Sequence, residues 1–258
     1  MEQYKTLISS LLEKGGRRDG RSVTEYRPIQ VDVNPIPRAN GSARVRIGKT
    51  EVVVGVKFDV DEPFPDTPEE GILIVNAELN PMANPDFEPG PPRPHAIELA
   101  RVVDRTIRES HFIAVDKLVI KAKEKVWVVF VDIYPFNDDG NLLDAAALAA
   151  VIALKNAVLP KYDEKEDKVL YKEMSKKKLE LNEIPILTTF GKISGHTFVD
   201  FDKKEENALD ARLSIATLPN GSMCAMQKGG VGPMTKEELF MLFEKAVEEG
   251  KELRKLVK

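Results

Sequence analysis

Short blocks of hydrophobic residues, several of them alternating with polar positions, recur through the first half of the chain and predict strands. These strands cover residues 43–47, 52–56, 72–77, 118–122 and 126–134. Gly48 and Lys49 stand between the first two blocks, so we expect those two strands to form a hairpin. Prolines between residues 63 and 94 resist regular helix, so that passage should be irregular apart from the strand inside it.

Helical patterns follow the strands in both halves of the sequence. Residues 96–110 have apolar side chains at helical spacing and predict an amphipathic helix, whereas residues 143–158 are apolar nearly all round and predict a helix buried against a sheet. The second half contains predicted strands at residues 186–190, 196–201, 212–217 and 223–227. A final helix should begin after Thr235, because Thr235 and Glu238 form a capping box.

A charged segment separates the two sets of elements. Residues 161–184 lack a clear apolar stripe, and we interpret them as an exposed connection. The amino-terminal half then covers residues 1–160 and the carboxy-terminal half residues 185–258. Both halves place strands before helices, which favours an α+β fold built from two similar β/α halves.

Composition narrows the class of protein. A chain of 258 residues, 42% of them hydrophobic, can bury a substantial core. The net charge of −4 argues against attraction to nucleic acid by the whole surface, so any RNA contact must be local. Cys224 is the single cysteine, which favours a reducing, cytoplasmic compartment, and no apolar run predicts a signal peptide or a membrane span.

The turn at residues 139–145 connects a predicted strand to the helix after it, a setting in which the helix N-terminus can hold an anion. We interpret Asn141, Leu142, Leu143 and Asp144 as a degenerate phosphate site. The two leucine side chains offer no hydrogen-bond donors. The carboxylate of Asp144 should repel an incoming phosphate by roughly 4 kcal/mol at contact distance near a protein surface.

A basic ridge is predicted on the helix at residues 96–110. Arg101, Arg105 and Arg108 have the spacing i, i+4 and i+7, so they share one face, opposite the apolar stripe. Periodicity alone leaves two interpretations open. The ridge could bind RNA, or it could be a solvated face paired with Asp104 and Glu109.

Other motifs carry no recognised chemistry. The three histidines lack the spacing of zinc ligands: His95, His111 and His196. We therefore expect neither a metal nor another cofactor. A glycine-rich turn lacks the lysine of a phosphate-binding loop: Gly229, Gly230 and Gly232. Cys224 is interpreted as a small core residue in a strand.

An arginine-rich stretch near the amino terminus and the hairpin after it carry a resemblance to a known family. The stretch from Arg17 to Arg21, followed by Glu25 and Arg27, is similar to an amino-terminal signature, and residues 41–52 are similar to a first hairpin. The chain resembles the ribonuclease PH family of phosphate-dependent 3'-to-5' exoribonucleases, which also forms the ring of the exosome. The resemblance implies the ribonuclease PH fold, which is ribosomal protein S5 domain 2-like.

The resemblance also implies that the phosphate site is lost. Active members carry an Asp-Gly-Gly-Thr-Arg-Thr-Ala turn that grips the attacking phosphate, with Ser often replacing Thr. Placed on residues 139–145, this pattern puts the family's arginine on Leu143 and its hydroxyl residues on Leu142 and Asp144. A catalytic set of residues is therefore not expected in this chain.

An acidic pair six residues apart is the second feature of active members. Asp210 matches one member of the pair, but the other falls on Lys204. Glu205 and Glu206 stand next to it, so a shifted alignment could restore a carboxylate. The alternative is that these acidic residues form a solvated loop.

Within the family, the resemblance is closest to the non-catalytic ring subunit of the archaeal exosome. It implies that a catalytic paralogue alternates with this chain in a hexameric ring, as a trimer of heterodimers, with RNA-binding cap proteins and single-stranded RNA as further partners. Such a subunit shapes its partner's active site and helps guide RNA for phosphorolysis, and matching arginines of ring subunits point toward the RNA path. The alternative is a phosphate-dependent exoribonuclease active by itself. A nucleotide-binding enzyme on a similar scaffold lacks a phosphate loop to support it.

Overall fold

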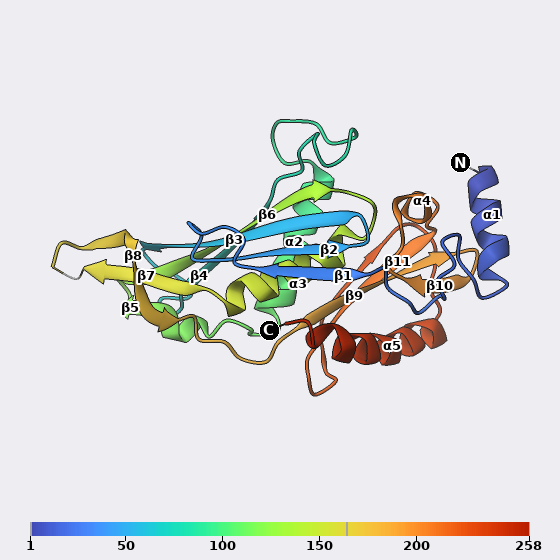
Figure 1. Cartoon of the computed structure of the whole chain (residues 1–258). Coiled ribbons are helices and arrows are strands. Elements are labelled where there is room, and N and C mark those ends of the chain that lie inside the picture. The colour runs from blue at the N-terminus through green and yellow to red at the C-terminus, as the bar shows by residue number, and fades with distance from the viewer. Residues whose placement is uncertain (1, 164, 258) are drawn as a thin grey trace.

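The computed structural model describes residues 2–163 and 165–257; Met1, Glu164 and Lys258, which fall at the ends of the predicted halves and inside the predicted connection, lie outside the described residues. Two sheets follow one another along an elongated molecule, and a separate hairpin extends from the end opposite the amino-terminal helix (Figure 1). Within the described part of the chain, no helix is both long enough and apolar enough to cross a membrane.

The first sheet contains the strands predicted for the first half. Its strand order is β1 (Ile29–Val33), β2 (Gly41–Ile47), β3 (Thr50–Asp61), β6 (Lys125–Asn137) and β4 (Ile72–Ala77), with β5 (Val119–Lys121) also paired to β6. A short 3-10 helix, η1 (Val115–Leu118), precedes β5. Only β4 runs parallel to its neighbour among the described pairs, because α2 and η1 separate it from β6 along the chain.

The second sheet is antiparallel throughout, with the order β10 (His196–Val199), β9 (Ile186–Ile193), β11 (Ala211–Thr217) and β12 (Met223–Gly229). Helix α5 (Lys236–Arg254) contacts β9 and β11, and it begins with the predicted capping box of Thr235 and Glu238. The amino-terminal helix α1 (Glu2–Leu12), which the pattern did not predict, packs Ile8 and Leu12 against this sheet. A short helix, α4 (Lys203–Glu206), follows β10.

Helix α3 (Leu142–Lys155) lies at the centre of the molecule. It contacts β2, β3 and β6 of the first sheet and β9 of the second, and every residue from 143 to 154 is buried, as the all-round apolar pattern predicted. The helix approaches β2 so closely that a Cβ on Gly41 would lie 2.3 Å from the carbonyl oxygen of Ala153. The other helix of this half, α2 (Pro94–Arg108), packs on β4 and α3.

The charged segment is exposed, as expected, but it is not a plain connection. It forms most of a hairpin of β7 (Val158–Asp163) and β8 (Lys168–Lys178). Backbone pairing holds the hairpin together, while most side chains of β8 are exposed, so no apolar stripe marks it in the sequence. Tyr162 packs edge-on against Trp127, and the hydroxyl of Tyr171 donates to Asp59 Oδ1 at 2.8 Å.

Candidate functional site

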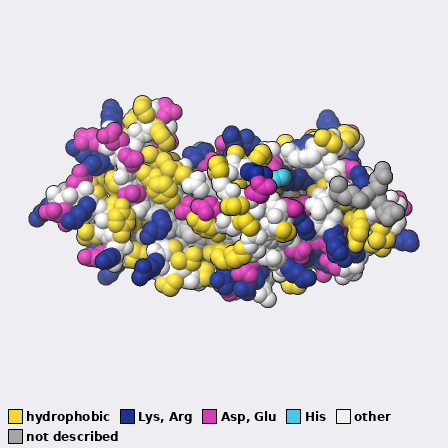
Figure 2. All heavy atoms as spheres, turned by 90° about the horizontal axis from the view of Figure 1, so that it is seen from above, with side chains coloured by type: hydrophobic (Ala, Val, Ile, Leu, Met, Phe, Trp, Pro, Cys, Tyr) yellow, Lys and Arg dark blue, Asp and Glu magenta, His cyan; other side chains and the backbone are white. Residues whose placement is uncertain are grey.

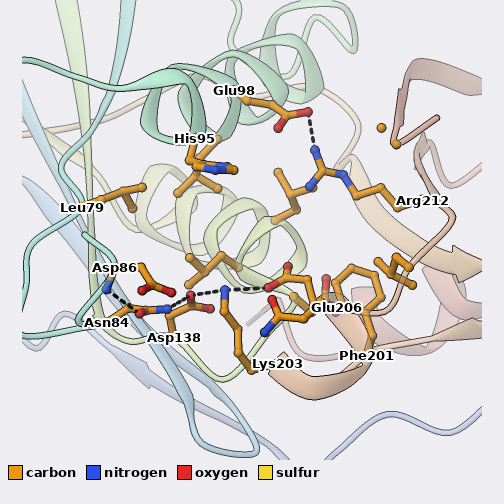
Figure 3. A pocket seen from close by; sticks show the side chains of 18 of the residues that line it. Leu79, Asn84, Asp86, His95, Glu98, Asp138, Phe201, Lys203, Glu206 and Arg212 are labelled. Atoms are coloured by element: carbon orange, nitrogen blue, oxygen red, sulfur yellow. Dashed lines mark hydrogen bonds and ion pairs between the residues drawn. The ribbon is translucent and has the colours of Figure 1, made fainter. Parts of the chain in front are cut away.

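A cavity of about 550 Å³ opens between the two halves, next to the turn that precedes α3 (Figure 3). Its walls come from the passage after β4, from α2, from the turn, from α4 and from β11 and β12. Large apolar side chains form much of the lining: Leu79, Phe87, Leu99, Leu142, Leu143, Phe201 and Leu209. The turn singled out in the sequence thus borders a cavity to which both halves contribute.

The backbone of this turn has little tolerance for other residues. Gly140 has φ +86°, and a Cβ there would lie 2.5 Å from the carbonyl carbon of Asp202, because the loop of the second half packs directly on the turn. Asn141 adopts the left-handed conformation, with φ 58° and ψ 43°, which asparagine accepts more readily than most residues. The contact between the halves therefore explains Gly140, and the left-handed backbone explains the asparagine after it.

The side chains after Gly140 differ in what they face. Leu142 and Leu143 line the cavity and present no side-chain donor to it. Asn141 is 1% exposed, and its Nδ2 donates to Asp144 Oδ2 at 3.0 Å and to Asp200 Oδ1 at 3.1 Å. Its Oδ1 accepts no hydrogen bond from the described residues, and the side chain does not cap α3.

Asp144 does not face an incoming anion, contrary to the expectation from the sequence. It is 2% exposed and does not line the cavity; its Oδ2 accepts from the Tyr26 hydroxyl at 2.8 Å and from the Thr189 amide at 3.1 Å. Burial raises the pKa of Asp144 to about 6, although these hydrogen bonds and that from Asn141 act in the opposite direction. The residue joins α3 to the second half. At the cavity, this turn is therefore characterised by two leucine side chains without hydrogen-bond donors, and not by the carboxylate of Asp144.

Most of the charged side chains of the cavity are paired with one another (Figure 3). Lys203 Nζ lies 2.6 Å from Asp138 Oδ2 and 2.8 Å from Glu206 Oε2, and Asn84 Nδ2 donates to the same Asp138 oxygen at 2.8 Å. Burial alone would lower the pKa of Lys203, but the two carboxylates outweigh it and raise the pKa, so the ammonium group stays charged. No local sequence signal predicted this cluster, because Lys203 and Asp138 come from different halves.

A second ion pair crosses the cavity from α2 to β11. Arg212 Nη2 is paired with Glu98 Oε1, and both residues line the cavity. Each of the two cationic side chains found in the lining, Lys203 and Arg212, is therefore already neutralised by a carboxylate. An anion entering this cavity would have to displace one of those carboxylates.

The acidic residues near Lys204 do not form a solvated loop. Glu205 is 2% exposed and is ion-paired with Arg17, whose Nε donates to Glu205 Oε1 at 3.0 Å. Asp210, the residue that matches one member of the family's acidic pair, is ion-paired with Lys5 and accepts from the Ser194 amide at 2.7 Å. Glu206 alone of these three carboxylates lines the cavity.

The arginines of the amino-terminal stretch hold the halves together. Arg27 donates from Nε and Nη2 to the two oxygens of Asp200 at 2.8 and 2.7 Å, and from Nη1 to the Asp139 carbonyl at 2.7 Å. Arg21 Nη1 lies 2.9 Å from Asp200 Oδ2, and Arg17 Nη1 donates to the Val199 carbonyl at 2.8 Å. Asp200 is completely buried. These arginines are structural, a role that the sequence alone did not reveal.

The basic ridge on α2 lies apart from the cavity lining. Arg108 is paired with Asp104 at 2.7 Å and donates to the Leu73 carbonyl at 3.0 Å, so it has structural partners. The Arg105 side chain donates from Nη1 to Gln227 Oε1 at 3.2 Å, its one hydrogen bond to the described residues. The exposed side chain of Arg101 makes no hydrogen bond or ion pair with any of them. Two of the three arginines thus remain available to a ligand.

The remaining sequence candidates occupy ordinary positions. Cys224 lies in β12 and is half-buried, and burial raises the pKa of its thiol. His95 lines the cavity, and the described residues contain no cluster of histidine, cysteine or carboxylate side chains able to hold a metal. Gly230 has φ +79°, and a Cβ there would lie 2.7 Å from the Asp210 carbonyl oxygen, so the glycine-rich turn serves close packing.

Sequence comparison places the chain among known proteins. Residues 25–160 match the model of the 3' exoribonuclease family, domain 1, and residues 183–249 match domain 2 of the same family. The exosome complex component Rrp42 of Methanosarcina acetivorans is 44% identical over 252 residues, which cover 98% of this chain and 92% of the relative. Rrp42 of Thermococcus gammatolerans is 45% identical over 252 residues, covering 97% and 92%.

Solved structures of exosome proteins are similar to this chain in fold. A chain of the Archaeoglobus fulgidus exosome with RNA bound to the active site has a TM-score of 0.92 and 42% identity, covering all of this chain and 98% of that one. A chain of an archaeal exosome core has a TM-score of 0.87 and 39% identity, covering 99% and 96%. Rice Rrp46, at 20% identity and a TM-score of 0.69, shares the fold.

Proposed function

Because the chain belongs to the 3' exoribonuclease family, whose fold it shares, we propose that it is a non-catalytic, RNA-binding subunit of an archaeal exosome ring. The Rrp42 relatives, which cover nearly the whole chain, support the place in the exosome. We also propose that the chain is divided into three parts. These are an amino-terminal half at residues 1–160, a charged segment at residues 161–184 and a carboxy-terminal half at residues 185–258.

The observation that carries the non-catalytic role is the composition of the cavity at the turn. Leu142 and Leu143 stand where the family's resemblance calls for a hydroxyl and an arginine, and both face the cavity. Lys203 and Arg212 are paired with carboxylates and so cannot replace the missing cation without breaking those pairs. A phosphate here would lose its hydration without gaining a free charged donor.

Assembly supplies the activity that this chain lacks. We propose that a catalytic ribonuclease PH-type paralogue alternates with it in a hexameric ring in the cytoplasm, and that RNA-binding cap proteins sit on the ring. Exposed large apolar side chains are consistent with covered surfaces in a complex: Phe64, Met82, Val231 and Phe240. Figure 2 shows yellow apolar patches among interleaved basic and acidic side chains on the face seen from above.

Single-stranded RNA is the proposed ligand of the available arginines. The mixed surface charge in Figure 2 and the net charge of −4 leave only local contacts for a polyanion. Arg101 and Arg105 are exposed and lack carboxylate partners among the described residues, unlike Arg108. They are the residues we propose to contact RNA phosphates.

An assay of phosphorolysis distinguishes this function from the alternative, an exoribonuclease that is active by itself. The assay compares the chain alone with the complex. Purified chain, the paralogue, and their mixture should each be incubated with 3'-labelled single-stranded RNA, with and without inorganic phosphate. We expect nucleoside diphosphates from the mixture only when phosphate is present, and none from this chain alone. Phosphate-dependent release by the chain alone would establish the alternative.

A further inference from the structure

Strand β8 carries more positive charge than its ion pairs neutralise. It has five lysines among its eleven residues and a single carboxylate, that of Glu173, which lies 2.8 Å from Lys161 Nζ. Lys168 is paired with Glu166 at 3.8 Å. The other four lysines are exposed and have no ion pair with a described residue: Lys172, Lys176, Lys177 and Lys178.

Two further cations, from the first half, lie beside the hairpin. Asn40 Nδ2 donates to Met174 Sδ at 3.4 Å, which places the turn before β2 against β8. Arg38 belongs to this turn, and Lys57 Nζ donates to its carbonyl oxygen at 3.1 Å. Neither side chain is ion-paired with a described residue, although the net charge of the protein is −4. We call these two residues and the four lysines the hairpin cations: Arg38, Lys57, Lys172, Lys176, Lys177 and Lys178.

Protection of an exposed strand edge accounts for only part of this cluster. Lysine on an edge strand discourages pairing with another chain, and β8 is an edge strand of the two-stranded sheet. Lys57, however, lies in β3, an inner strand of the first sheet, and Arg38 lies in a turn. Edge protection explains neither of these residues. The clustered charge therefore indicates an anionic ligand.

An aromatic ring beside the hairpin cations gives a second, independent indication. Tyr171 is 54% exposed, yet its hydroxyl donates to Asp59 Oδ1 at 2.8 Å, so the ring is oriented while it remains accessible. Asp59 lies two residues after Lys57 on the same face of β3, which brings the ring and the cations together. Single-stranded nucleic acid is bound by this combination, because its phosphates contact cations and its bases stack on aromatic rings. An acidic protein would use the cations but not the ring.

We propose that the hairpin cations and Tyr171 bind single-stranded RNA, with phosphates at the cations and a base stacked on the tyrosine ring. None of these residues lines the cavity, and none belongs to the basic ridge on α2. The hairpin lies at the end of the molecule opposite α1 (Figure 1), so this is a separate RNA contact. The choice of RNA as the anion rests on the proposed function, which gives the chain an RNA ligand.

The lysines are tested by the fluorescence anisotropy of labelled single-stranded RNA, measured without phosphate over a series of potassium chloride concentrations. Complexes of confirmed hexameric mass are used. The β8 variant combines three substitutions: Lys172→Ala, Lys176→Ala and Lys177→Ala. The matched control changes three lysines of α5 that also have no ion pair with a described residue: Lys236→Ala, Lys245→Ala and Lys251→Ala. We expect the β8 variant to reduce the slope of log affinity against log salt by about 2, at about 0.7 per phosphate, and the control to leave it unchanged.

The aromatic ring is tested by two substitutions of one residue. Tyr171→Ala removes the ring and should weaken binding of single-stranded RNA about fivefold or more, whereas Tyr171→Phe keeps the ring and should bind like the wild type. Double-stranded RNA of the same length should not distinguish Tyr171→Ala from the wild type, because its bases are already stacked. Photo-crosslinking of RNA that contains 5-iodouridine should give an adduct at Tyr171, identified by mass spectrometry, and this locates the site without a variant.

An unchanged salt slope in the β8 variant, or equal affinity of Tyr171→Ala and the wild type, would overturn the proposal. Loss of the hexameric mass in the β8 variant would also overturn it, because the surface would then hold a protein. The proposed function is decided separately, by phosphorolysis in the same preparations. Phosphate-dependent release by a complex whose slope is unchanged would refute this RNA site alone, whereas release by the chain alone would refute the non-catalytic role and leave the site to the salt slope.

Discussion

Replacing Asp144 with asparagine should remove a pH dependence from the stability of the protein. The carboxyl is buried at the contact of α3 with the second half, and burial raises its pKa from 3.8 to about 6. At about 1.36 kcal/mol per pKa unit, this difference corresponds to roughly 3 kcal/mol of free energy of unfolding. The protonated carboxyl is the form that the folded state favours.

The sign follows from the direction of the shift. A group whose pKa is raised on folding contributes its full stability below the unfolded-state value near 3.8, and that contribution is lost as the pH rises through about 6. Wild-type protein should therefore lose about 2.4 kcal/mol from this group between pH 4 and pH 7, whereas Asp144→Asn should not. A penalty for the altered hydrogen bonds of the amide does not vary with pH, so it cancels when only the change with pH is compared.

Chemical unfolding at several pH values, followed by the fluorescence of the single tryptophan, Trp127, measures the difference between the two proteins. Asp210→Asn is a control of opposite sign, because the hydrogen bond from Lys5 lowers the pKa of Asp210. The stabilisation from Asp210 is present above the unfolded-state value and is lost as the pH falls through the folded-state value. A difference between wild type and Asp144→Asn that stays constant from pH 4 to pH 7 would refute the assignment of a raised pKa.

Three further substitutions test other contacts. Arg17→Ala leaves a buried carboxylate unpaired and should lower the free energy of unfolding by about 3–5 kcal/mol; a loss below about 1 kcal/mol in chemical unfolding would contradict a structural ion pair. Gly41→Ala forces a methyl group against the backbone of α3 and should cost about 1–3 kcal/mol, which a thermal unfolding midpoint equal to that of wild type would contradict. Combined Arg101→Ala and Arg105→Ala should reduce the slope of log affinity for RNA against log salt by about 1–2 in complexes of confirmed hexameric mass. Arg108→Ala, the control already paired within the helix, should leave that slope unchanged.

The local sequence pattern predicted helices and strands whose buried positions recur at the spacing of that helix or strand, and it predicted a helix start that has a capping motif. The apolar run of α3, the strand at Ile72–Ala77 and the capping box of Thr235 each have a signal within a few residues, and the structure confirms all three. The β7–β8 hairpin was not recognised because its backbone pairs while its side chains remain in water. A strand whose side chains are exposed on both faces does not produce the alternation of apolar and polar residues by which strands are predicted.

The candidate site could be predicted from the sequence only as a turn of adjacent residues. Leu142 and Leu143 line the cavity, but the direction of Asp144 depends on Tyr26 and Thr189, which come from distant segments. The pairing of Lys203 with Asp138 likewise exists only after the halves meet. The charge balance of such a cavity depends on residues that only the folded chain brings together. A linear motif could therefore show that Leu142 and Leu143 have no donors, but it could not show the charge of the cavity.

The buried joint between Asp200 and the amino-terminal arginines has a consequence for how this family is recognised. Arg21 and Arg27 belong to the stretch whose sequence resembles the family, and both fasten one half to the other. A chain with this arrangement of halves needs that fastening in order to fold, whether or not it binds phosphate. The residues that carry the family resemblance can therefore stay the same while the residues that line the cavity change.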